Sequence, residues 1–205
     1  MSTTDVADHA KSGRNRGTKA VHLFPFAAGV FALLILPGPT NAILAMASQG
    51  LTAGRAIMLL GTVVAAYLAI VVPASGLAGP FLHQHPLVAQ GVKLASATWV
   101  FYLALRLWGS GSSPTEVVTV RQLAITTLLN PKALIIGLTM MPSAQEVSGI
   151  DATAALAFVV LFASLIWLST GRIVLGSEKE MPLLARRCGS ATLLVFSAAL
   201  TLSAF

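Results

Sequence analysis

Six apolar segments, each about as long as a membrane-spanning helix, occupy most of this chain. A helix needs about 20 apolar residues, within a range of roughly 17–25, to cross the hydrocarbon core of a bilayer. Backbone groups in lipid must bond to one another, and no segment shows the alternation of a barrel strand, so we expect helices. The segments are Leu23–Gln49, Ala56–Gly79, Pro86–Trp108, Gln122–Pro142, Ala152–Gly171 and Cys188–Phe205.

The charged residues are too few for a soluble protein. Asp, Glu, Lys and Arg make up 10% of the 205 residues, against about 25% in a soluble domain. This excludes a soluble enzyme and a disordered chain, and the single cysteine, Cys188, excludes an internal disulfide or a CxxC site. We therefore predict a polar basic tail over residues 1–22 and one all-α membrane domain over residues 23–205.

The net charge of +6 orients the chain in a membrane rather than binding nucleic acid, because the basic residues are scattered between the apolar segments. The connections after the second and fourth segments carry no Lys or Arg. By the positive-inside rule the other connections are cytoplasmic, which places both termini outside. Those connections carry Arg55, Arg106, Arg121, Arg172, Lys179, Arg186 and Arg187.

The first segment is interrupted by two prolines. Pro37 and Pro39 have no N–H, so the carbonyls of Leu33 and Ile35 lose their helical donors. The chain then starts a new helix, which we expect Thr40 or Asn41 to cap. The whole break consists of Pro37, Gly38, Pro39, Thr40 and Asn41.

The fourth segment is interrupted in the same way by Asn130, Pro131 and Lys132. Asn130 is the expected cap, Pro131 the first helical residue, and the Thr127 carbonyl is left free. The segments thus divide three and three, each half opening with a broken one, which predicts an inverted repeat with halves of about 23–108 and 122–205. Paired breaks in corresponding positions are typical of a transporter's binding site.

Lys132 lies in the middle of its segment, where a lysine costs roughly 2.5–3.5 kcal/mol on insertion scales. All carboxylates of the chain lie in tails or connections, so none offsets this charge within a segment. Both ends of the segment are too far for the side chain to snorkel to the interface. Lys132 must therefore face a wet cavity, backbone carbonyls or an anionic ligand.

Three stretches of the chain resemble the LysE/RhtB family of amino-acid exporters. The stretch 36–41, followed by Gly50 and Gly54, resembles the family's opening signature, with Thr40 where the family usually has asparagine. The stretch 93–103 resembles its Lys-Leu-x-Gly-x-x-Tyr-Leu-x-Tyr-Leu motif, and 129–133 its fourth-segment motif. The resemblance implies a six-helix exporter of amino acids or related zwitterions in the inner (plasma) membrane, driven by protons.

On this basis we expect a secondary transporter, with the substrate held between the two breaks. The two helix N-termini and Lys132 would bind its carboxylate, and the carbonyls of Leu33, Ile35 and Thr127 its ammonium group. No catalytic residue, metal or cofactor is expected. The predicted binding residues are Pro37, Gly38, Pro39, Thr40, Asn41, Asn130, Pro131 and Lys132.

The expected partners are a small amino-acid-like substrate, the lipid bilayer and protons as the coupling ion, with no nucleic acid; a homo-oligomer stays open. A membrane-embedded enzyme is the first alternative, but His83 and His85 lie in a connection and His9 and His22 in or near the tail, so we expect no nucleophile–base pair within the segments. A passive channel for small polar solutes is the second, and a saturable flux would separate it from a carrier. An accessory subunit would have no use for two matched breaks.

Overall fold

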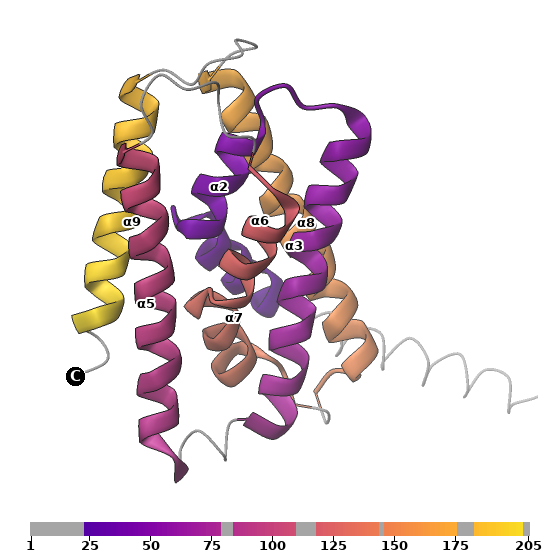
Figure 1. The fold of residues 1–205 in the computed structure, drawn as a ribbon. Helices are drawn as coiled ribbons and strands as arrows, with labels where there is room; N and C mark the ends of the chain where they lie inside the picture. Colours follow the sequence, from indigo (N-terminus) through magenta and orange to yellow (C-terminus); the bar gives the residue numbers. More distant parts are fainter. Residues whose placement is uncertain (1–22, 79–83, 110–117, 144–145, 176–182, 203–205) are drawn as a thin grey trace, which may run out of the picture.

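The computed structural model describes residues 23–78, 84–109, 118–143, 146–175 and 183–202. All regular structure in these ranges is helical (Figure 1). The predicted N-terminal tail, residues 1–22, lies outside the described residues. The prediction of an all-α membrane protein is confirmed at this level, since several of the helices are long and apolar enough to cross a membrane.

Three helices are continuous over a membrane-spanning length. Helix α3 (Ala53–Pro73) continues into a short π-helix, η1 (Ala74–Ala78), and the other two are α5 (Pro86–Gly109) and α8 (Gly149–Leu175). Their apolar spans are Ala53–Gly76, Pro86–Gly109 and Gly149–Val174.

Two further spans are bent at the predicted breaks. The helix Leu23–Ile35 meets α2 (Pro39–Ala47) at 69°, and α6 (Val120–Leu128) meets the helix that continues over Pro131–Met140 at 43°. This last helix consists of α7 (Pro131–Ile135) and η2 (Ile136–Met140). Both proline motifs therefore interrupt their helices as predicted.

The sixth predicted segment is also helical, as α9 (Leu183–Leu202), but its apolar part, Arg187–Leu202, is short for a span. The described residues thus contain three helices long and apolar enough to cross a membrane, or up to five spans when each bent pair counts as one, so the six predicted spans are not all found among them.

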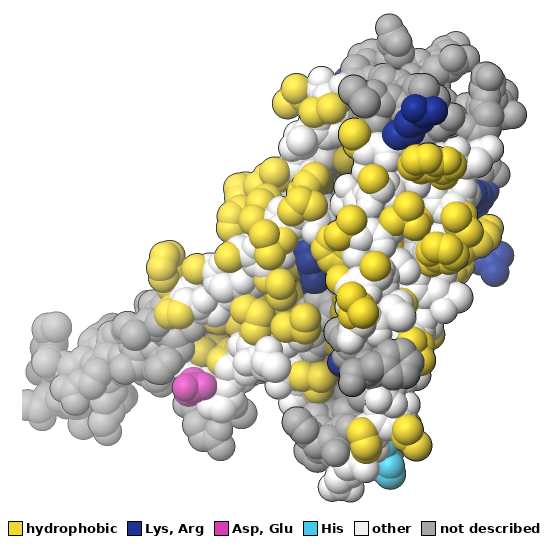
Figure 2. All heavy atoms as spheres, turned by 90° about the vertical axis from the view of Figure 1, so that its left-hand side faces the viewer, with side chains coloured by type: hydrophobic (Ala, Val, Ile, Leu, Met, Phe, Trp, Pro, Cys, Tyr) yellow, Lys and Arg dark blue, Asp and Glu magenta, His cyan; other side chains and the backbone are white. Residues whose placement is uncertain are grey.

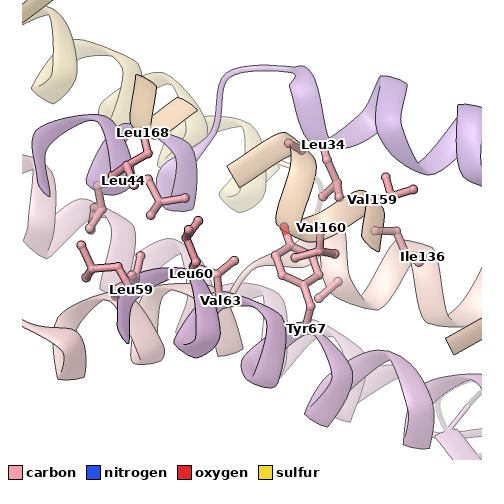
Figure 3. Close-up of a cluster of buried hydrophobic side chains, with 14 of the residues drawn as sticks. Leu34, Leu44, Leu59, Leu60, Val63, Tyr67, Ile136, Val159, Val160 and Leu168 are labelled. Atoms are coloured by element: carbon pink, nitrogen blue, oxygen red, sulfur yellow. The ribbon is translucent and has the colours of Figure 1, made fainter. Parts of the chain in front are cut away.

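Helices α2, α3, α6 and α8 pack together, while α5 and α9 lie side by side at one edge of the bundle (Figure 1). Figure 3 shows part of the apolar core, in which Leu44 lies near Leu168 and Tyr67 near Val160. The largest fully buried side chains are Ile43, Leu44, Leu59, Leu123, Ile136, Leu156, Leu193, Val30, Val63, Val71, Val100 and Val147.

The outer surface carries many large apolar side chains. Figure 2 shows hydrophobic side chains spread over much of the face that α5 and α9 present. Soluble monomers rarely expose apolar patches of more than a few hundred Å², whereas lipid tails solvate such a surface. Exposed examples are Ile57, Leu87, Phe101, Trp108, Phe158, Ile173, Val195 and Leu202.

Two glycines allow helices from different halves of the chain to touch at their backbones. A Cβ on Gly171 of α8 would collide with the backbone of Ala45 in α2. A Cβ on Gly137 of η2 would lie 2.6 Å from the Cβ of Ala74 and 3.0 Å from the carbonyl oxygen of Val71. Only glycine fits at such close crossings.

Candidate functional site

The first break opens α2 without a side-chain cap. Gly38 is the N-cap residue, in an extended conformation, and Pro39 occupies the first turn. The prediction that Thr40 or Asn41 caps this helix is therefore wrong, because the fixed φ of Pro39 suits the first helical position and starts the helix earlier. Asn41 instead reaches back across the break, and its Nδ2 donates to the carbonyls of Leu34 and Leu36, each at 2.8 Å.

The second break is capped as predicted. The side chain of Asn130 accepts from the backbone N–H of Lys132 at 3.1 Å, and Pro131 occupies the first turn of α7. The Thr127 carbonyl, however, is not free. It accepts from the backbone N–H of Asn130 at 3.1 Å, because the last turn of α6 tightens where the helix ends.

The two breaks meet in the middle of the bundle. The Nδ2 of Asn130 donates to the Oγ1 of Thr40 at 2.9 Å, so the capping residue of one break holds the first turn of the other. The Nζ of Lys132 donates to the carbonyl of Leu36. The chain thus brings together most of the predicted binding residues, and those that are buried are Gly38, Pro39, Thr40, Asn41, Asn130 and Lys132.

The two remaining predicted residues act on the backbone. Pro37 is exposed and Pro131 is half-buried. Each lies directly at a bend between helices, so its contribution is the interruption of the helix.

Lys132 has 6% of its surface exposed and is surrounded by the first break. A Cβ on Gly38 would lie 3.1 Å from its Nζ and 3.2 Å from its Cε, so the absence of a side chain at Gly38 makes room for the lysine. Of the three expected environments, the structure shows a backbone carbonyl. The ammonium group also lies beside the N-terminus of α2, the positive end of that helix's dipole.

Tyr67 of α3 completes the site and was not among the predicted residues. Its side chain is 2% exposed, and its hydroxyl accepts from the Nδ2 of Asn130 at 3.2 Å. A signal was available in the sequence, since Tyr67 is the largest polar side chain in a predicted segment, Ala56–Gly79, that has no charged residue. We call the set Gly38, Thr40, Asn41, Tyr67, Asn130 and Lys132, with the Leu36 carbonyl, the polar centre.

The polar centre has the groups to bind a small molecule. Among the described residues there is no group of His, Cys, Asp or Glu side chains that could hold a metal ion. Its side chains are hydroxyls, amides and one ammonium group, which recognise a ligand through hydrogen bonds and charge.

Comparison of the chain with protein-family models, with curated proteins and with solved structures gave no match. The resemblance to the LysE/RhtB exporters therefore stays a prediction from the sequence motifs. Fold and site together define an all-helical membrane protein with a buried polar centre between two broken helices.

Proposed function

We propose that this protein is a secondary transporter that exports amino acids or related small zwitterions across the inner membrane, driven by protons. The observation that carries the proposal is the position of Lys132, buried where the two breaks meet. The resemblance of the sequence motifs to the LysE/RhtB exporters supports the direction of transport, the membrane and the coupling ion.

The electrostatics of the polar centre favour an anionic ligand. A lysine in the middle of a membrane segment costs roughly 2.5–3.5 kcal/mol, and here it lies beside the positive end of α2. The ammonium group and the positive helix terminus repel each other, and the dipole of the Leu36 carbonyl offsets only part of this repulsion. A substrate carboxylate bound at the first turn of α2 would neutralise both.

The ammonium group of a zwitterion would find acceptors on the other side of the first break. Pro37 and Pro39 cannot donate to the carbonyls of Leu33 and Ile35. The Thr127 carbonyl, which the sequence had also suggested, is already engaged by Asn130. We therefore assign the ammonium group to the carbonyls before the first break alone.

Two pairs of contacts support an inverted repeat that would alternate access to this site. In one, Ala45 of the first broken span packs on Gly171 of α8; in the other, Gly137 of the second broken span packs on Ala74 of η1. The partners are exchanged between halves: the broken span of each half crosses the middle helix of the other. This is the pattern that a two-fold axis between the halves would generate.

Helices α5 and α9, the third helices of the two halves, also make a pair of contacts that a two-fold axis would exchange. The Oγ of Ser197 donates to the carbonyl of Ala97 at 2.9 Å, and the Oγ of Ser190 donates to the carbonyl of Ala104 at 2.7 Å. The sequence distance from Ala97 to Ser190 equals that from Ala104 to Ser197. It differs by one position from the distance between the prolines that open α2 and α7.

The proposal is tested by efflux from proteoliposomes that contain the purified protein, loaded with a mixture of radiolabelled amino acids. We expect the efflux of at least one amino acid to saturate with its concentration and to rise when a proton gradient is imposed. A flux that grows linearly with concentration would identify a passive channel, and no flux of any amino acid would contradict the proposed substrate class.

A further inference from the structure

The side-chain amide of Asn130 orients two buried hydroxyls. Its Oδ1 accepts from the backbone N–H of Lys132, which fixes the amide so that Nδ2 faces away from that bond. Nδ2 then donates both of its protons, one to Thr40 at 2.9 Å and one to Tyr67 at 3.2 Å. Since both hydroxyl oxygens act as acceptors towards Asn130, each directs its own proton elsewhere.

The polar centre consequently holds more donors than it uses. A hydroxyl has one proton to donate and a lysine ammonium three. The Leu36 carbonyl takes one ammonium proton. For the hydroxyl protons of Thr40 and Tyr67, and for the other ammonium protons, no acceptor lies within hydrogen-bond distance in the part of the chain that the structure describes. Buried donors of this kind are costly unless an acceptor satisfies them.

Two carbonyls at the first break are already engaged. The carbonyls of Leu34 and Leu36 both accept from Asn41. The carboxylates of the described residues, Glu146 and Asp151, lie between η2 and the first turn of α8, outside the broken helices. In the proposed function the carbonyls of Leu33 and Ile35 bind the ammonium group of the substrate. The acceptor for these donors is then the other end of the ligand, and the Lys132 ammonium group favours a negatively charged one.

We propose that Tyr67 and Thr40 donate to the same oxyanion that Lys132 binds, so that both oxygens of a substrate carboxylate are engaged. The inference rests on the proposed function and identifies the carboxylate as the part of the substrate that the site recognises. A hydroxyl that accepts from Asn130 is polarised and becomes a stronger donor. A carboxamide offers one oxygen and turns an NH₂ group towards these donors, so the site rejects it.

The first test compares two tyrosine variants in the proteoliposome assay, with the amino acid that gives the largest flux. We expect Tyr67→Phe, which keeps the ring and removes the hydroxyl, to raise the KM about tenfold at unchanged abundance. Tyr102→Phe is the matched control, because Tyr102 is half-exposed on α5 and should keep the parental KM. A Tyr67→Phe variant with lower abundance and the parental KM would show that Tyr67 only supports Asn130, and would overturn the inference.

The second test replaces Thr40 by serine or by valine. Serine keeps the hydroxyl and should keep the KM, whereas valine keeps the shape and should raise it. Equal KM values for the two variants would remove Thr40 from the carboxylate site.

The third test needs no variant. The parental protein should transport the amino acid but not its carboxamide, and equal transport of the two compounds would overturn the inference while leaving the proposed transport intact. If no amino acid moves at all, the proposed function fails, and this inference falls with it.

Discussion

At the second break, the residue before the proline caps the new helix with its own side chain, whereas at the first break the new helix begins without a side-chain cap. Asn130 and Pro131 satisfy α7 locally. The first break instead depends on Asn41, which reaches back to Leu34 and Leu36, and on Lys132 from the other half of the chain.

This difference shows that two similar proline motifs do not have equivalent roles. The second break satisfies its own helix N-terminus through the Asn130 cap. From there the side chains of Asn130 and Lys132 extend to the first break. The first break leaves its helix N-terminus open and receives the ammonium group beside it. We therefore expect changes to Asn130, the cap of the second break, to affect stability most. Changes to the first break, or to the Lys132 ammonium group beside it, should affect transport most.

The largest effect on transport is expected when the first break is closed. Replacing Pro37 and Pro39 together by alanine restores two backbone donors and lets the helix run through. We expect normal membrane abundance with loss of efflux, measured as flux per molecule in proteoliposomes. Pro25→Ala is the control, because Pro25 is exposed near the start of the helix Leu23–Ile35 and should have no effect. Parental flux in the double variant would show that the first break is only a structural kink and has no role in transport.

At the second break, Asn130→Ala should have the largest effect on stability. The change removes a helix cap and the hydrogen bonds to Thr40 and Tyr67. We expect a loss of about 2 kcal/mol, since a cap alone contributes roughly 0.5–2 kcal/mol. The measurement is the unfolding free energy of the purified protein in detergent.

Asn41→Ala tests the other side of the comparison and should cost less. It removes two side-chain bonds to carbonyls, one of which, that of Leu36, keeps Lys132 as its donor. Polar bonds inside membrane proteins average about 0.6 kcal/mol, so we expect a loss of about 1 kcal/mol in the same unfolding measurement. A larger loss for Asn41→Ala than for Asn130→Ala would invert the proposed division of roles.

The features that depend on neighbouring residues were predictable from the sequence. The helical segments follow from apolar runs between polar connections, and the positions of both breaks follow from the missing N–H groups of proline. The Asn130 cap was also predictable, because asparagine before proline is a local signal.

The features that depend on the tertiary fold were not. Sequence alone offered three environments for Lys132, and only the packing of the two breaks shows that the Leu36 carbonyl is one of its partners. Tyr67 was missed because its partner, Asn130, lies 63 residues away in the sequence, at the break between α6 and α7. The cap of α2 was predicted wrongly because the side chain of Asn41 bonds across the break instead of to its own helix.

The central claim is that the positive charge of Lys132 binds the substrate, and Lys132→Met tests it most directly. Methionine keeps an apolar stem and relieves the insertion cost of the charge, so the variant should be at least as abundant in the membrane as the parent. Lys93→Met, the same change in α5, is the control and should keep its activity. We predict that Lys132→Met loses efflux per molecule while Lys93→Met does not; parental efflux per molecule in Lys132→Met would contradict the account.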